Sequence, residues 1–341
     1  MDGINVQDIA PGQQIEIDLF RPEDAEGVAA LFHAIYGEQY PHRVYYDPRA
    51  LRAENAAGRI ISSVARTAGG DVVGHSALFQ TAPFPSLYES GAGLVLPSYR
   101  HTSGILTRLL AHGFEVAPRR FGVEAIFGDA VLNHPFTQKA ALNQGAMFTG
   151  LQVDLMPAAP YAKEGSSSGR VSSLVTINLC KPRPQRVHLP APYQDVLGGI
   201  YRELADQRDL VVSDQPVPPG SPSRVETRFF GFAQVARMQA TEIGEDFAER
   251  FALAEKTATD QGALVLQAWL DLSIPWLGWA VDCLRARRYF LGGVVPRWFD
   301  HDALFVQKIL HRPHWEGIVM ELTRGQELLD LVREDWERSL G

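Results

Sequence analysis

The stretch Gly91–Val116, GAGLVLPSYRHTSGILTRLLAHGFEV, most constrains what this chain can fold into. A short apolar run ends at Pro97, which has no N–H group to give to a neighbouring strand. From Ile105 to Phe114 the apolar residues recur at helical spacing. The stretch therefore predicts a strand, a turn and the start of a helix. The first amides of that helix and its dipole point at the turn, where they suit an anion such as phosphate.

Two residues of the turn favour an anion site. Arg100 adds a positive charge, and Gly104 has no side chain to obstruct an approaching ligand. A second interpretation is a solvated loop that caps the helix through Ser103. The spacing alone leaves both interpretations open.

The same turn resembles the acyl-CoA signature of the Gcn5-related N-acetyltransferase (GNAT) superfamily, V-x-P-x-Y-R-G-x-G-x-G-x-x-L-L. The matching residues are Val95, Pro97, Tyr99, Arg100, Gly104, Leu109 and Leu110. Three glycines of the pattern are replaced by His101, Ser103 and Ile105, and the remaining glycine is shifted by one residue. The resemblance implies that the strand binds the pantetheine arm and the turn holds the pyrophosphate. The implied cofactor contacts are Leu94, Val95, Leu96, Arg100, His101, Thr102, Ser103, Gly104 and Ile105.

Composition excludes several classes of function. The 341 residues suggest two domains, and a net charge of −8 with a pI near 5.7 argues against binding to nucleic acid or a membrane surface. Two cysteines, Cys180 and Cys283, cannot form a disulfide framework, and no metal-ligand spacing occurs, so we expect no metal. No run of about 18 apolar residues appears, and we expect a cytoplasmic protein.

An aromatic segment, Tyr36–Pro48, follows a predicted strand at Gln14–Phe20 and a helix that starts at Pro22. This opening also resembles the GNAT superfamily, in which the corresponding region lines the acceptor pocket. The implied substrate contacts are Tyr40, His42, Tyr45 and Tyr46. The alternative is that these tyrosines pack with their hydroxyl groups at the surface.

Two further candidates lie on the strands that follow. His75 is placed with the substrate contacts, although a single histidine within a strand is more often structural. Glu89 lies on a largely apolar strand, where desolvation would raise its pKa toward the range of a general base. The resemblance implies that Glu89 takes the proton of the acceptor amine, often through a water. The alternative is a solvent-facing strand end.

The segment NHPFTQKAALNQGAMFTG, residues 133–150, resembles the second GNAT signature. It predicts a helix from Asn133 to Gln144, with Asn133 as N-cap and cofactor contact. The tyrosine that protonates the departing thiolate in the family is replaced by Ala141. His134 is then the candidate general acid, or the thiolate leaves unassisted, since a thiol pKa near ~8.5 makes assistance optional.

A linker rich in proline, glycine and serine divides the chain. We expect a mixed α/β fold, a mixed sheet flanked by helices, with a GNAT acyl-CoA-binding domain at 14–157, a linker at 158–170 and a degenerate GNAT-like domain at 171–341. The second half repeats elements of the first, but the segment Asp271–Pro275 offers no anion turn. We therefore expect that half to close the acceptor site or to mediate formation of a homodimer.

These patterns indicate an acyl-CoA-dependent N-acyltransferase. The expected reaction transfers an acetyl group from acetyl-CoA to the primary amine of a small molecule by direct attack. The absent tyrosine and the lost glycines favour a non-catalytic acyl-CoA or metabolite sensor instead. A third reading is an acyltransferase of secondary metabolism that uses longer acyl chains.

Overall fold

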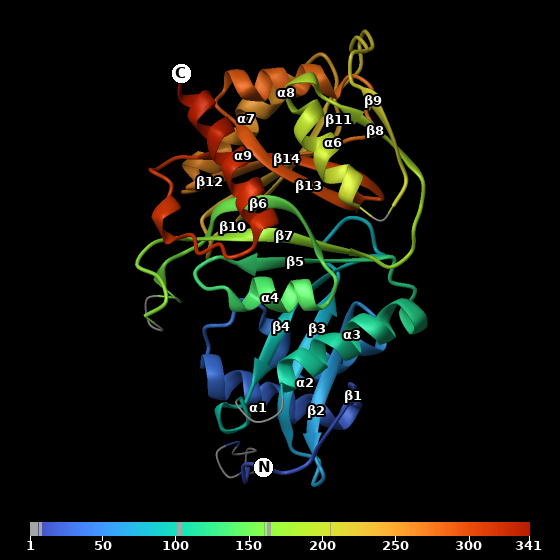
Figure 1. The fold of residues 1–341 in the computed structure, drawn as a ribbon, viewed down its shortest axis with the longest axis vertical. Coiled ribbons are helices and arrows are strands. Elements are labelled where there is room, and N and C mark those ends of the chain that lie inside the picture. The colour runs from blue at the N-terminus through green and yellow to red at the C-terminus, as the bar shows by residue number, and fades with distance from the viewer. Residues whose placement is uncertain (1–5, 7–8, 101–103, 160, 162–164, 205) are drawn as a thin grey trace. The chain divides into compact units, whose positions relative to one another are not determined.

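The computed structural model describes residues 1–341 except 1–5, 7–8, 101–103, 160, 162–164 and 205. Contacts within the chain divide it into two units, Met1–Ile126 and Phe127–Gly341. The domain limits expected from the sequence, on either side of the linker at 158–170, stay a prediction. Both units contain sheets flanked by helices, and the predicted mixed α/β class is confirmed (Figure 1). No helix in the described part of the chain is long and apolar enough to cross a membrane.

The first unit contains an antiparallel run of four strands, and each hydrogen-bonds to the next in chain order. The strands are β1 (Ile15–Leu19), β2 (Ile60–Thr67), β3 (Val72–Phe79) and β4 (Leu87–Val95). Its helices are α1 (Ala25–Tyr36), α2 (Pro48–Ala56) and α3 (Ile105–Phe121), with short 3-10 turns η2 (Pro22–Asp24), η3 (Arg43–Tyr46) and η4 (Pro97–Tyr99). The bounds of β1 and the start of α3 agree with the strand predicted at Gln14–Phe20 and the helix predicted from Ile105.

Helices cover both faces of this sheet. A Cβ atom built on Gly74 would lie 3.1 Å from the side chains of Ile105 and Leu109, so Gly74 faces α3. The ring of His75 lies 5.6 Å from that of Phe32 in α1. Because successive residues of a strand point to opposite faces, α1 and α3 lie on opposite faces of the sheet.

A buried ion pair fixes the start of α1 to β2. Both nitrogens of the Arg66 fork donate to the carboxylate of Asp24, and each side chain is only 5% exposed. Arg66 also donates to the carbonyl of Leu19 at 2.8 Å, and Asp24 accepts from the backbone of Arg21. The pair is therefore surrounded by further hydrogen bonds, as a buried ion pair requires.

The strands of the second unit have the order β5-β7-β6-β13-β14-β12-β11-β10. Their bounds are β5 (Ala125–Val131), β6 (Met147–Met156), β7 (Val171–Leu179), β10 (Arg224–Phe230), β11 (Val235–Glu242), β12 (Val265–Asp271), β13 (Phe290–Phe299) and β14 (His301–Ile309). A separate pair consists of β8 (Gln185–Leu189) and β9 (Arg208–Val212). The helices are α4 (Phe136–Asn143), α6 (Gln194–Glu203), α7 (Phe247–Asp260), α8 (Leu277–Ala286) and α9 (Thr323–Leu340).

The strand order of this unit contains a repeat. The groups β5-β7-β6 and β12-β14-β13 have the same connections, and they meet where β6 pairs with β13 at Gly150 and Gly293. The contact is close, because a Cβ atom on Gly293 would lie 2.3 Å from the Cα atom of Gly150. Asp154 and Arg297, each four residues beyond the paired glycine, both have a positive φ.

This order corrects one inference from the sequence. The strands β11 and β12 are parallel and are joined through α7. The strand-to-helix turn to compare with the one after Pro97 is therefore 243–246. The segment Asp271–Pro275 instead joins β12 to α8, as 132–135 joins β5 to α4. The correct turn contains Glu245 and Asp246, whose carboxylates would repel a phosphate. The expectation that the second half does not bind a phosphate at this position stays a prediction, now based on the turn 243–246.

Candidate active site

The end of β4 departs from regular pairing with β3. His75 lies opposite Leu94 and Ala77 lies opposite Gly91, so Ser76 faces both Ala92 and Gly93. This is a β-bulge, and Ala92 has a φ of 50°, which is uncommon for a residue with a side chain. A bulge takes backbone groups out of the ladder and frees them for other partners. The run of small residues from Gly91 to Gly93 is the sequence signal for this bulge.

Beyond the bulge the chain runs into the predicted turn. The Nε atom of Arg100 donates to the carbonyl of Val95 at 3.0 Å, which holds the guanidinium group beside the end of β4. Gly104 has the left-handed conformation, with a φ of 58°, and α3 starts at the next residue. His101, Thr102 and Ser103, three of the predicted cofactor contacts, lie outside the described residues. Leu94 and Leu96 are buried, and Leu96 pairs with Val73 at the end of the strand.

The predicted acceptor residues gather on the α1 side of the sheet. Phe32 lies at the centre, with ring centroids 5.0 Å from Tyr40, 4.6 Å from Tyr45 and 6.3 Å from Tyr46. The ring of His42 lies 5.7 Å from that of Tyr40. The hydroxyl oxygen of Tyr46 accepts from the backbone N–H of Tyr40 at 2.9 Å, so Tyr46 fixes the segment between them.

His75 is part of this cluster but has no exposed surface. Its Nδ1 atom lies 2.9 Å from the carbonyl of Ala92 and its Nε2 atom 3.0 Å from the hydroxyl of Ser62. Because a carbonyl only accepts, Nδ1 carries the proton and Nε2 accepts from the serine. Burial lowers the pKa of His75 to about 4, and the ring is neutral at pH 7. His75 therefore holds the bulge in place. Its role as a substrate contact stays a prediction.

Glu89 projects toward the same cluster. It lies opposite Phe79 in the pairing of β3 with β4, and Phe79 shares its face of the sheet with His75. The hydroxyl of Thr81 donates to Oε2 of Glu89 at 2.8 Å, a contact that the sequence did not predict. Burial raises the pKa of both Tyr40 and Tyr45, and the nearby charge of Glu89 adds to that effect. The carboxylate is thus held close to two neutral phenol groups.

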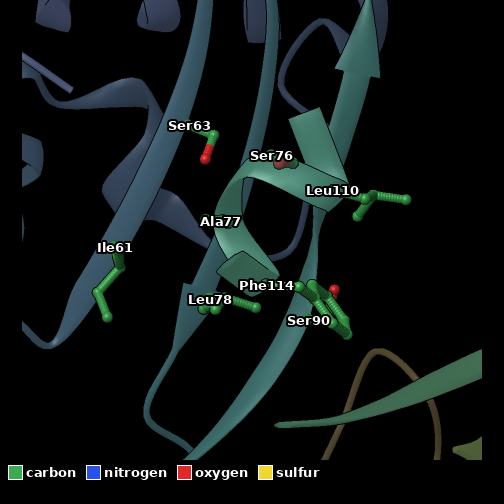
Figure 2. Close-up of a pocket in the computed structure, with 9 residues that line it drawn as sticks. Ile61, Ser63, Ser76, Ala77, Leu78, Ser90, Leu110 and Phe114 are labelled. Carbon is green, nitrogen blue, oxygen red and sulfur yellow. The ribbon is translucent and has the colours of Figure 1, made fainter. Parts of the chain in front are cut away.

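Figure 2 shows a hollow between α3 and the sheet of the first unit. It is lined by Ile61, Ser63, Ser76, Ala77, Leu78, Ser90, Leu110, Gly113 and Phe114. Ser90 follows Glu89 in β4, so the two side chains point to opposite faces. The hollow therefore lies on the α3 side, away from the cluster of tyrosines.

Two predicted residues belong to the second unit. The side chain of Asn133 donates to the hydroxyl of Ser166 at 3.0 Å, and the N-cap position of α4 is occupied by Pro135. The prediction of Asn133 as N-cap is therefore wrong, because the helix starts three residues later. The ring of His134 lies 5.3 Å from that of Phe136. The proposed cofactor and acid roles of Asn133 and His134 stay predictions.

Neither cysteine is suited to carry an acyl group. Burial raises the pKa of Cys180 to about 11 and also raises the pKa of Cys283. The thiolate is the reactive form, so both side chains are poor nucleophiles at neutral pH. The described residues also contain no group of three or more histidine, cysteine, aspartate or glutamate side chains that could hold a metal ion.

Comparison with known proteins gives weak similarity to one group of enzymes. No protein-family model matches the chain, and no curated protein matches its sequence. Similar solved structures include an N-acetyltransferase from Staphylococcus aureus, with 14% identity and a TM-score of 0.40 over 50% of this chain and all of that one. Another is spermidine N-acetyltransferase from Vibrio cholerae in complex with CoA and spermine, with 12% identity and a TM-score of 0.38 over 49% of this chain and 95% of that one.

A dodecameric structure of the Vibrio cholerae enzyme has the same identity and TM-score, and 94% of that chain is covered. These three solved structures are N-acetyltransferases, and each is similar to about half of this chain. TM-scores this low assign neither a family nor a function, and the chemistry has to be argued from the residues themselves.

Proposed function

We propose that this chain transfers an acyl group, in the simplest case acetyl, from acyl-CoA to the primary amine of a small molecule. The observation that carries the proposal is that one strand, β4, holds both a carboxylate and a bulge. Glu89 lies at its start, the bulge at Ala92 and Gly93 lies in the middle, and the predicted anion turn with Arg100 follows its end. The three features follow the order of an extended acyl-CoA, from reacting carbonyl to pyrophosphate.

Each feature has a chemical task in this reaction. The amine of the acceptor loses a proton to Glu89, and its lone pair attacks the thioester carbonyl carbon. A backbone N–H of β4 near Val95 stabilises the negative charge that develops on the carbonyl oxygen. The carbon–sulfur bond then breaks, and the CoA thiolate leaves. Alignment of the two bound reactants supplies much of the rate.

The proposal is tested by release of free thiol from acetyl-CoA across a panel of primary amines. We expect turnover with at least one amine, and a Glu89→Gln variant with kcat lowered by about 10²-fold or more. The Kd for acetyl-CoA should be unchanged in that variant, with one molecule bound per chain. An unchanged kcat in the Gln variant would remove Glu89 from the mechanism.

A second candidate is a non-catalytic acyl-CoA or metabolite sensor. Ala141 stands where the GNAT pattern has its acid, and His101, Ser103 and Ile105 replace three glycines of the turn. Such a protein would bind acetyl-CoA and release no thiol with any amine. Longer acyl chains are distinguished by replacing acetyl-CoA with longer acyl-CoA donors in the same assay.

Three wider expectations accompany the proposal. The second unit is proposed to be a degenerate repeat, because its groups β5-β7-β6 and β12-β14-β13 share one connectivity. We propose that the second half does not bind acyl-CoA, because the turn after β11 is acidic. A cytoplasmic location and a homodimer remain predictions.

A further inference from the structure

The hydroxyl group of Tyr45 is a buried polar group without a hydrogen-bond partner among the residues that the structure describes. The side chain is only 1% exposed. Buried hydroxyl groups in native proteins are nearly always paired, because an unmade hydrogen bond is costly. An exception within a candidate site points to a partner that the protein chain itself does not supply.

The ring of Tyr45 is held firmly, so the hydroxyl cannot turn toward another part of the protein. Phe32 stacks on it, with 4.6 Å between centroids and an interplanar angle of 9°. The edges of His75 and Tyr40 meet it at 5.4 Å and 5.7 Å. His75 is itself fixed at both nitrogens, by Ala92 and Ser62. The position of the hydroxyl is therefore set by the core of the first unit.

The carboxylate of Glu89 and the hydroxyl of Tyr40 are the candidate partners for a water at the hydroxyl of Tyr45. The carboxylate of Glu89 is close enough for its charge to act on both Tyr40 and Tyr45, and Thr81 holds one of its oxygens. A buried water needs two to four polar partners. Two phenol groups and a carboxylate are such a set.

We infer that Tyr45 is a positioning residue whose hydroxyl, together with Glu89, holds the water that carries the proton away from the acceptor amine. This inference rests on the proposed acyltransfer. The N–H bond of the amine breaks as that water takes the proton and passes one of its own to the Glu89 carboxylate. The nitrogen forms its bond to the acyl carbon, the carbon–sulfur bond breaks, and the thiolate regains the proton from Glu89 through solvent. No other reactant is consumed.

The test compares Tyr45, whose hydroxyl has no hydrogen-bond partner among the described residues, with Tyr88, whose hydroxyl has two. Tyr88 is also buried, but its hydroxyl donates to the carbonyl of Gly58 at 2.7 Å and accepts from Gln80 at 3.1 Å. In Tyr45→Phe we expect a Tm equal to or above that of the wild type and a kcat lowered by about 10-fold to 100-fold. KM for the amine and Kd for acetyl-CoA should stay within about twofold. In Tyr88→Phe we expect the reverse: a lower Tm and an unchanged kcat.

A double variant completes the test. If Tyr45 acts through the proton path of Glu89, Tyr45→Phe should cost little further activity in a Glu89→Gln background. If the fold-reduction in kcat of the double variant equals the product of the two single reductions, the inference is overturned. An unchanged kcat in Tyr45→Phe alone would also overturn it. A raised KM with unchanged kcat would show that the hydroxyl binds the acceptor directly, which also overturns it. Absence of turnover in the wild type with every amine would instead refute the proposed function.

Discussion

The burial of His75 predicts that the first unit loses stability in mild acid. The ordinary pKa of a histidine is 6.5, and burial lowers that of His75 to about 4. The unfolded chain therefore binds a proton at a pH where the folded chain does not. Stability from the neutral ring is complete above pH 6.5 and is lost as the pH falls toward 4. Full loss amounts to about 3 kcal/mol, and about 2 kcal/mol is lost by pH 5.

The assay is amide hydrogen exchange of β3, measured on the full chain between pH 7.5 and 4.5. After correction for intrinsic exchange rates, the slowest amides report the free energy of opening. His75→Asn is the reference variant, because its amide can still donate to the carbonyl of Ala92 and does not titrate in this range. We expect the opening free energy of the wild type to approach that of the variant as the pH falls. A constant difference across the range would refute the reasoning.

Two further predictions concern the second unit. Gly293→Ala should lower its unfolding free energy by about 3 kcal/mol or more in urea titrations, because the added Cβ atom would meet Gly150 and the φ is 139°. Gly262→Ala, with a φ of 92° and open space around the Cβ position, should cost only about 1 kcal/mol, and equal losses would contradict the role of the contact. Burial raises the pKa of Asp129 from 3.8 to about 6. Ionisation of this carboxyl group therefore destabilises the folded state as the pH rises from about 4 to 6. Asp129→Asn should therefore add about 3 kcal/mol at pH 7.5 and only about 0.5 kcal/mol at pH 4, and the opposite trend would refute this.

The local elements of this fold could be predicted from the sequence because each has a local cause. The turn Ala68-Gly69-Gly70 marks the hairpin of β2 and β3, and Pro48 marks the start of α2. Tyr40, Tyr45 and Tyr46 lie within one short segment, so their gathering around Phe32 is also a local feature. Such features depend on residues a few positions apart.

Other features depend on partners far away in the chain. The sequence of β4 does not show that Ser76 of β3 will lie opposite two β4 residues. It also does not show that the carbonyl of Ala92 will accept a hydrogen bond from His75. The sequence pattern also pointed to Asp271–Pro275 as the turn of the second half that corresponds to the one after Pro97. The strand pairing is needed to see that β11 and β12 are parallel and that the corresponding turn follows β11. The sequence shows that residue 75 is a histidine, a residue type that often contacts ligands. It does not show that the side chain is fully buried.

The linker between β6 and β7 has a consequence for how the chain responds to a protease. The two strands that it joins are antiparallel neighbours, paired from Met147 with Ile177 to Met156 with Val171. Beyond β6 lies β13, so β6 has a partner on each side. A nick in the linker would therefore leave both pieces held together by the sheet, since a longer or broken loop costs little. The linker therefore connects two paired strands of one sheet. Cleavage there creates a new chain end on each side, and the pairing of β6 with β7 keeps the two fragments together.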